Sequence, residues 1–541
     1  MIRSEIRRIL TEVINEKFGQ QSELNFSVEV PENEEHGDYS TNAALVLAKI
    51  LGKKPMEVAN EIISKLETRS YKPEAIQPGF INFFAPPEVL YKELSGVLEK
   101  KNSYGNSDIG KNKKARVEYI SANPTGPIHV GNARGGPLGE TIARVLEKSG
   151  YEVLREYFHN DAGSQVEKMG KTIWYWYKKE LGEETEFPEG GYQGEYPKEI
   201  AKKVLEKFGE KLSEKDLPKL TKFGIEKIWE ENQSTIQKLG IEFNEVVKES
   251  ELLSSGKTEK IVEKLKNLGV AKEHDGALWL APQDEFLEDK EAVLVRSNGQ
   301  PTYFASDAAY HREKFESGSD LVIDILGSNH HGHVPRLKAL AKVFGFDPEK
   351  FLVVLYQYVR IKRGKEVINM SKRAGNFVTA REVLDEVGRD SFNFSILLHS
   401  ANSHIDFDLE LAKKQSEENP VYYAQYAYAR CCSILNKLQA TSYKLQATNF
   451  SLLKEPVALG LIKKLLQFPE VVEDAARDFQ VQRLPRYATE LAKIFHNFYE
   501  KCRVITDDES LTQARLNLVL ATKLVLKNTL NLLNIDTPEK M

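Results

Sequence analysis

A strand–helix–strand pattern over residues 115–158 constrains the fold more than any other feature of the sequence. Residues 115–120 alternate apolar and polar side chains as a strand does, and residues 151–158 form a second strand. The segment between them starts as a loop of Pro and Gly residues and continues as a helix over about 132–148. The expected buried face of this helix consists of Leu138, Ile142, Val145 and Leu146. Such a short crossover joins parallel strands, so the sequence predicts an α/β domain with a parallel sheet.

Two more apolar runs extend this sheet. Residues 321–326 and 351–355 are almost continuously apolar, which is typical of strands buried on both faces. Residues from about 164 to 290 are instead rich in Lys and Glu and have mostly helical periodicity. We therefore expect a Rossmann-like parallel-sheet domain over residues 106–400, interrupted by a helical insertion at about 170–290.

The two ends of the chain have different patterns. Residues 1–105 read as a small α/β domain, with an amphipathic helix at the start and a strand at 78–84. Gly37 begins a turn into a second helix, for which Ser40 or Thr41 is the expected N-cap. From about residue 420 the periodicity is helical to the end, which predicts a C-terminal α-helical bundle within residues 401–541.

Composition limits the class of protein. The chain has 541 residues, 41% hydrophobic and 29% charged, as expected for a globular protein of several domains. It has no apolar run near the roughly 20 residues needed to cross a bilayer, and its N-terminus lacks the apolar core of a signal peptide. Its three cysteines form no disulfide framework. We expect a cytoplasmic protein without membrane contact, and the net charge of -5 argues mildly against RNA binding.

A candidate anion-binding motif lies at the start of the 132–148 helix. In Pro127-Ile-His-Val-Gly-Asn132, the free N–H groups of a helix N-terminus are placed to face a phosphate. Gly131 would let the backbone approach a ligand without a Cβ in the way. His129 and Asn132 could donate hydrogen bonds to charge that develops on a phosphate. The alternative is a turn in which these side chains only cap the helix.

A second candidate motif, Asn369-Met-Ser-Lys-Arg373, lies about 240 residues later in a basic stretch. A mobile lysine such as Lys372 suits a departing pyrophosphate, because its ammonium acts as a point charge without fixed geometry. Met370 and Ser371 would contact ATP beside it. The alternative is a solvated basic turn.

Together, the two motifs resemble the paired ATP-handling motifs of class I aminoacyl-tRNA synthetases. Many members have His where this chain has Asn132, and the second family motif begins with Lys where this chain has Asn369. The segment 117–129 is similar, nearly letter for letter, to one in arginyl-tRNA synthetases. The same holds for residues 160–163, 303–307 and 419–423, and for residues 37–40 and 78–82 of the N-terminal domain. The resemblance spans nearly the whole chain and is weakest over about 170–290.

The resemblance implies an arginine pocket. A guanidinium is planar and always charged, so its selection calls for carboxylates in fixed geometry. By the family pattern, Glu118, Tyr303 and Asp307 contact the guanidinium, and Asn123 holds the α-amino group. Tyr303 and Asp307 are four residues apart, which places them on one helical face if that stretch is helical. The alternative is that Glu118 and Asp307 are surface charges.

Histidines follow the predicted strand at 321–326. In Asn329-His-His-Gly-His333, we assign His330 and His331 to the substrate pocket in the manner of the family, since ligands bind at the carboxyl ends of such strands. A zinc site would need a fourth ligand and preferably cysteines, and no Cys pair is near in the sequence. We expect no protein-bound metal.

The resemblance implies an arginine–tRNA ligase that acts as a monomer on ATP, Mg²⁺, L-arginine and tRNA(Arg). The family activates arginine to arginyl-adenylate, usually only with tRNA bound, and then transfers it to the tRNA 3′ end. His129 and Asn132 would stabilise the reacting phosphate, and Lys372 the leaving pyrophosphate. Two alternatives are another class I synthetase and a non-catalytic tRNA-binding paralogue, the latter favoured only by Asn132 and Asn369.

Overall fold

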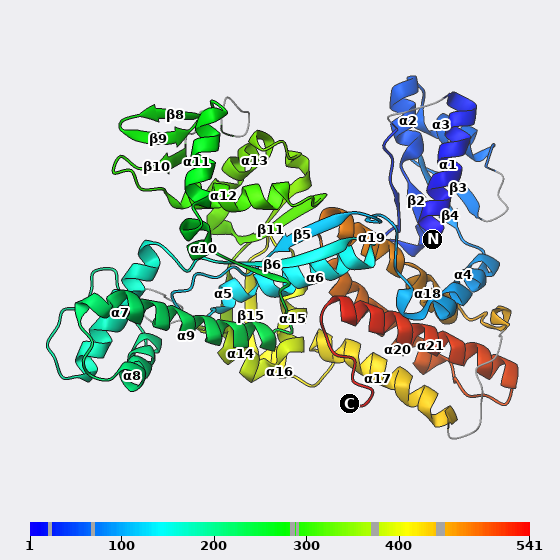
Figure 1. Ribbon diagram of the computed structural model, residues 1–541. Helices are drawn as coiled ribbons and strands as arrows, with labels where there is room; N and C mark the ends of the chain where they lie inside the picture. The colour runs from blue at the N-terminus through cyan, green and yellow to red at the C-terminus, as the bar shows by residue number, and fades with distance from the viewer. Residues whose placement is uncertain (20–23, 67–70, 282–286, 288–291, 369–377, 440–448) are drawn as a thin grey trace.

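A five-stranded parallel sheet lies at the centre of the computed structural model (Figure 1). The structure describes residues 1–19, 24–66, 71–281, 287, 292–368, 378–439 and 449–541. The strand order is β12-β11-β5-β6-β7, and all four pairings are parallel. The strands are β5 (Lys114–Glu118), β6 (Glu152–His159), β7 (Glu245–Lys248), β11 (Leu321–Gly327) and β12 (Phe351–Tyr356). The chain runs outward from β5 to β7 and returns to β11, so the order reverses between β5 and β11. The predicted parallel sheet is confirmed.

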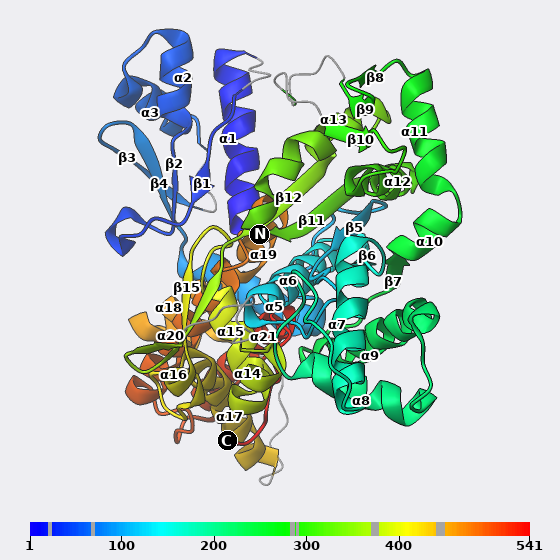
Figure 2. The same ribbon diagram turned by 90° about the vertical axis from the view of Figure 1, so that its left-hand side faces the viewer.

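Helices cover both faces of this sheet. The helices α5 (Val130–Ala133) and α6 (Gly135–Lys148) follow β5, and the residues of α6 expected to be buried are buried. The helices α12 (Tyr303–Glu316) and α13 (Val334–Val343) lie on the opposite face. Neighbouring residues of β11 show the division, because Ile323 belongs to the same core cluster as α6 while Val322 packs with α12 and α13. Figure 2, which is turned by 90° from the view of Figure 1, shows these layers from the side.

The insertion is mostly helical, as predicted, but it also contains strands. Its helices are α7 (Ser164–Glu180), α8 (Tyr196–Phe208), α9 (Leu217–Lys238), α10 (Glu249–Ser254) and α11 (Lys257–Asn267). The strand β7 completes the central sheet, and β8 (Ala271–His274), β9 (Ala277–Leu280) and β10 (Ala292–Val295) form a separate antiparallel sheet. The strand β7 was not predicted because it is short and lies at the sheet edge, partly exposed to solvent. Its sequence therefore does not stand out from the Lys- and Glu-rich stretch around it.

The N-terminal domain and the insertion helices α7 to α9 lie on opposite sides of the molecule (Figures 1 and 2). The N-terminal sheet has the order β1-β2-β4-β3. Its strands are β1 (Val28–Glu29), β2 (Tyr39–Thr41), β3 (Lys72–Ile76) and β4 (Phe80–Phe84), accompanied by α1 (Ile2–Phe18), α2 (Ala43–Leu51) and α3 (Pro55–Ile63). The predicted N-cap was wrong: Ser40 and Thr41 belong to β2, and Asn42 precedes α2.

The C-terminal bundle is helical, as predicted. It contains α17 (Pro420–Gln439), α18 (Pro456–Leu466), α19 (Phe468–Asp478), α20 (Arg483–Lys501) and α21 (Glu509–Leu532). The helix α4 (Pro87–Lys100) packs against α18 and α21 and so ties the first part of the chain to the bundle. No helix among the described residues is long and apolar enough to cross a membrane.

A small fourth sheet connects the central sheet to the bundle. It has the order β14-β13-β15, with β13 (Val359–Arg363), β14 (Glu366–Ile368) and β15 (Ile405–Asp408). The helices α14 (Ala380–Val387), α15 (Arg389–Leu397) and α16 (Leu409–Lys413) accompany it. The strand β15 runs parallel to β13, so residues 405–408 pack with the elements that precede them in the chain.

Candidate active site

A cavity of about 600 Å³ opens where the strand order reverses, at the carboxyl ends of β5 and β11. Ligands of open α/β sheets bind at this point, and the volume suits a small-molecule substrate. The predicted residues that line it are Glu118, Asn123, His129, Gly131, Asn132, Tyr303, Asp307 and His330. The structure therefore brings together eight residues that are spread over more than 200 positions of the sequence.

The first motif forms the turn into α5. The Nδ1 atom of His129 accepts a hydrogen bond from the backbone N–H of Asn132 at 3.2 Å, so His129 is the N-cap of this helix. A neutral imidazole that accepts at Nδ1 carries its proton on Nε2. A Cβ at Gly131 would lie 2.9 Å from Cε1 of His129, so glycine is needed here to leave room for the ring. The capping interpretation is thus compatible with a catalytic one, because the cap fixes which nitrogen is the donor.

The chain leaves β5 through a strained turn. Ile120 and Ser121 have φ values of 67° and 35°, a region that side-chain-bearing residues rarely adopt. The Ser121 hydroxyl donates a hydrogen bond of 2.7 Å to Oε1 of Glu118 and accepts one of 3.0 Å from the backbone N–H of Phe158. The turn therefore fixes Glu118 at the cavity floor.

The insertion holds the loop that carries the first motif. The side chain of Asn232 on α9 accepts a hydrogen bond of 2.9 Å from the Ile128 N–H and donates one of 3.2 Å to the Gly126 carbonyl. The Tyr196 hydroxyl on α8 donates to the Thr125 carbonyl at 2.9 Å. Asn232 is buried. Two insertion helices thus position residues 125–128, the segment that directly precedes His129.

The second motif lies outside the described residues, so the places of Met370, Ser371 and Lys372 are not given by the structure. Its flanks are described. The strand β14 ends at Ile368, and on the other side the Ala380 N–H donates a hydrogen bond of 2.8 Å to the Ile128 carbonyl. His129 also forms an isolated β-bridge with Thr379. The chain that leaves the second motif is therefore joined to the first motif.

Helix α12 contributes Tyr303 and Asp307, and the expectation that they lie on one helix is confirmed. The Tyr303 hydroxyl accepts a hydrogen bond of 3.0 Å from the Ser164 N–H of α7. Burial raises the pKa of Asp307 to about 6, and Glu118 acts in the same direction while His311 opposes it. The Asp307 carboxylate is thus a negative group at the cavity whose charge is sensitive to pH just below neutrality.

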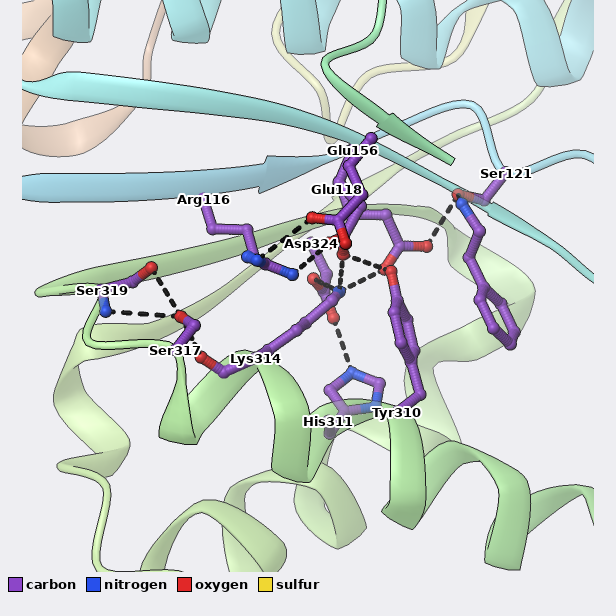
Figure 3. Close-up of polar contacts among 12 residues, drawn as sticks. Arg116, Glu118, Ser121, Glu156, Tyr310, His311, Lys314, Ser317, Ser319 and Asp324 are labelled. Carbon is purple, nitrogen blue, oxygen red and sulfur yellow. Dashed lines mark hydrogen bonds and ion pairs between the residues drawn. The ribbon is translucent and has the colours of Figure 1, made fainter. Parts of the chain in front are cut away.

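Glu118 is buried and already bound within the protein (Figure 3). Its Oε2 atom accepts hydrogen bonds from the Tyr310 hydroxyl, at 3.0 Å, and from the Lys314 ammonium. Its Oε1 atom accepts only the Ser121 bond among the interactions of the described residues. Glu118 is therefore not a surface charge, and it lines the cavity.

Glu249 is a carboxylate that the sequence analysis missed. It begins α10 directly after β7 and is buried, and its Oε2 atom has no hydrogen-bond partner among the described residues. Burial raises its pKa to about 7; Asp307 raises it further, whereas hydrogen bonds from Ser306 and Asn160 lower it. The sequence could have indicated Glu249 only by its position directly after a strand. That strand was not predicted, and the region contains many other glutamates.

The histidines after β11 occupy the short helix η4 (Ser328–His333). His330 and His333 line the cavity, whereas His331 does not. Burial lowers the pKa of His330, so its imidazole is neutral near pH 7. The Nδ1 atom of His333 lies 3.9 Å from the Asp307 carboxylate. Among the described residues, no group of three or more His, Cys, Asp or Glu side chains could hold a metal ion.

Comparison with known proteins identifies the family. The arginine–tRNA ligase of Acetivibrio thermocellus is 42% identical, over 95% of this chain and 93% of the relative. That of Caldanaerobacter subterraneus subsp. tengcongensis is also 42% identical, over 100% of this chain and 99% of the relative. The structure of Thermus thermophilus arginyl-tRNA synthetase covers 100% of both chains with a TM-score of 0.79 at 23% identity, which supports the fold.

Family models match along the chain. An arginyl tRNA synthetase N terminal domain matches residues 2–85, the catalytic domain of class I tRNA synthetases (R) matches residues 93–396, and a DALR anticodon binding domain matches residues 424–541. The catalytic match alone spans more than half of the 541 residues. With this agreement over its full length, the chain belongs to the class I arginyl-tRNA synthetases, the arginine–tRNA ligase family.

Proposed function

We propose that the protein activates L-arginine with ATP to arginyl-adenylate and transfers the arginyl group to the 3′ end of tRNA(Arg). The observation that carries this proposal is the cavity at the strand-order reversal, where the first motif and the arginine-pocket residues meet. The curated relatives that match the whole chain are arginine–tRNA ligases, and the C-terminal region matches an anticodon-binding domain.

The arginine side chain would enter between β5 and α12. Asp307 offers a carboxylate and Glu118 its Oε1 atom, while Tyr303 lies at the cavity edge on the same helix as Asp307. A guanidinium has five N–H donors in a fixed fork, so carboxylates from two elements can read its shape as well as its charge. Asn123 would hold the α-amino group, and His330 lines the same pocket.

Glu249 would act behind this pocket. Its carboxyl group lies close enough to Asp307 for the Asp307 charge to raise the pKa of Glu249. Arrival of a guanidinium would favour ionisation of both groups, so arginine binding would release protons near neutral pH. We assign Glu249 to the arginine pocket on this ground.

In the activation step, the arginine carboxylate would attack the α-phosphate of ATP and pyrophosphate would leave. The Nε2–H of His129 and the amide of Asn132 would donate hydrogen bonds to the reacting phosphate, and Gly131 would leave room for the histidine ring. Lys372 would stabilise the pyrophosphate with Met370 and Ser371 beside it. In the second step, a ribose hydroxyl of the terminal adenosine would attack the arginyl carbonyl and release AMP.

We further propose that Mg²⁺ enters with ATP, and that the enzyme works as a monomer in the cytoplasm. An Mg²⁺ ion usually keeps several waters and binds substrate phosphates, so it does not require a set of protein ligands. His331, outside the cavity lining, would face the entering substrate or tRNA end. The insertion would be a structural element, because α8 and α9 hold the loop before His129.

ATP–pyrophosphate exchange tests the proposal. We expect exchange with arginine when tRNA is present, and none with lysine, because a buried carboxylate site made for a planar fork leaves hydrogen bonds unpaired around an ammonium. Exchange that depends on another amino acid would mean that the protein is a class I synthetase of different specificity. Folded protein that binds tRNA without exchange would be a non-catalytic paralogue.

A further inference from the structure

Four carboxylates occupy one register row of the central sheet. Asp324 of β11 lies opposite Glu118 of β5. Glu118 in turn lies opposite Glu156 of β6, and Glu156 lies opposite Glu245 of β7. Asp324, Glu118 and Glu156 are each exposed by 4% or less. Like charges directly opposite one another on neighbouring strands repel, and a buried carboxylate without a counter-ion tends to take up a proton. The row therefore requires cations.

Lys314 supplies the central cation (Figure 3). Its side chain extends from α12 and is fully buried, and its Nζ atom contacts the three buried members of the row. It binds Oε2 of Glu118, lies 2.7 Å from Oδ1 of Asp324 and lies 3.5 Å from Oε1 of Glu156. The guanidinium of Arg116 pairs with Glu156 and, at 3.2 Å, with Glu245. Lys314 is thus the cation that pairs with Glu118.

The other polar groups around the row come from α12 and η4. The Tyr310 hydroxyl bonds to both Glu118 and Glu156, and the Nε2 atom of His311 lies 2.9 Å from Oδ2 of Asp324. Asp307 precedes His311 by one turn, and His330 lies near enough to Glu118 for an electrostatic interaction. Lys314 and Arg116 are thus the lysine and the arginine that pair with the three buried carboxylates.

We propose that Lys314 is a positioning residue for arginine recognition: by binding Oε2 it fixes the carboxylate of Glu118, so that Oε1 is left for the incoming guanidinium. This inference rests on the proposed arginine pocket. It gives the buried lysine a role besides stability, because the bond to Oε2 fixes the orientation of a carboxylate that also lines the cavity.

Lys314→Met tests the inference because methionine is similar in length and has no charge. Without the ammonium, one of the clustered carboxylates would hold a proton near neutral pH. We expect the KM for arginine in the exchange reaction to rise by roughly 10- to 100-fold at pH 7, with a small change in the KM for ATP. Because arginine must then displace that proton, the ratio of variant to wild-type KM should fall as the pH rises from 7 to 9.

Three variants separate this role from general stability. Lys314→Arg keeps the charge and should show no such pH dependence of the ratio. The double variant Lys314→Met with Asp324→Asn removes one cation and one anion, so its row keeps the wild-type charge. It should raise the KM for arginine by a factor that does not vary with pH, since one cation and one anion are removed together but Glu118 is no longer held in place. Lys257→Met removes an exposed ion pair between α11 and Glu313, the neighbour of Lys314 on α12, and should leave the KM unchanged.

The outcomes are distinct. A folded Lys314→Met variant with wild-type KM for arginine, or with a raised KM whose ratio does not change with pH, would overturn the inference. If this variant does not fold, the double variant and Lys314→Arg decide: a double variant with wild-type KM would reject the role of Lys314. Failure of the wild-type protein to exchange with arginine at all would instead reject the proposed function.

Discussion

The Nδ1 atom of His129 accepts the backbone hydrogen bond of Asn132 at 3.2 Å, so the two candidate phosphate-binding residues are directly linked. The bond sets the ring orientation and leaves the proton of the neutral imidazole on Nε2. A residue that caps a helix can therefore also be a positioned donor. The predictions below test this link and the supports around it.

Gly131→Ala should impair catalysis without unfolding the protein. The new Cβ would lie 2.9 Å from Cε1 of His129, so the ring must move, and a displacement of this kind typically lowers kcat by roughly 10- to 100-fold. Exchange kinetics give the measurement. Gly96→Ala in helix α4 is the matched control, because a Cβ there meets nothing within 4 Å, and its kcat should equal that of the wild type.

Asn232→Ala should lower activity from a distance. The variant loses the hydrogen bonds that hold the Ile128 N–H and the Gly126 carbonyl, and an unpaired buried group costs about 1–3 kcal/mol. We expect kcat/KM for ATP to fall by roughly tenfold or more, as the loop before His129 loses its anchor. Gln233→Ala changes the exposed neighbouring residue and should have no effect. Wild-type kinetics in Asn232→Ala would mean that the insertion does not position this loop.

Asp307 should determine the acid limb of the pH profile, which is the fall of kcat/KM for arginine at low pH. Its pKa is raised to about 6, so its carboxylate is ionised above that pH and gains a proton below it. We expect kcat/KM for arginine to fall as the pH drops below about 6. Asp307→Asn should raise the KM for arginine by roughly 100-fold and abolish this limb, since the asparagine has no charge to lose. An unchanged acid limb in the variant would assign it to another group.

Glu249→Gln should stabilise the protein without ligand at high pH. The pKa of Glu249 is about 7 in the folded protein, above its usual value, so the folded state binds the extra proton and stability declines as the pH rises through the range from about 4.5 to 7. Glutamine resembles the protonated form. The variant should match the wild type at pH 5 and exceed it at pH 8 by up to about 3 kcal/mol.

Thermal unfolding at the two pH values measures this difference. The same variant should bind arginine more weakly, because one negative charge behind the pocket is then missing. Equal thermal midpoints of variant and wild type at pH 8 would contradict the raised pKa.

Periodicity predicted most of the fold, because it reports burial directly. The unit of β5, α6 and β6 and the strands β11 and β12 all follow from apolar patterns that match their periods. The strand β7 could not be predicted in this way, since it has four residues and is exposed at the sheet edge. The N-cap of α2 was misplaced because Ser40 and Thr41 have capping side chains but belong to a strand whose partner is distant in sequence.

The site residues that belong to a family motif could be predicted from the sequence. The residues that act only through tertiary contacts could not. His129 and Asp307 stand in recognisable motifs, and the structure brings them to one cavity. Lys314 and Asn232 act through partners 196 and 104 positions away in the sequence, and Glu249 acts through Asp307 on another helix, so no local pattern reveals them. His333 lines the cavity in place of His331 because the turn of η4 decides which histidine faces inward.

The most direct test of the account is ATP–pyrophosphate exchange by the wild-type protein with each of the twenty amino acids, in the presence of tRNA. The account predicts exchange with arginine alone, and a KM for arginine that is raised by roughly 100-fold in Asp307→Asn, because the Asp307 carboxylate would contact the guanidinium. Exchange that depends on a different amino acid, or arginine-dependent exchange that survives unchanged in Asp307→Asn, would contradict it.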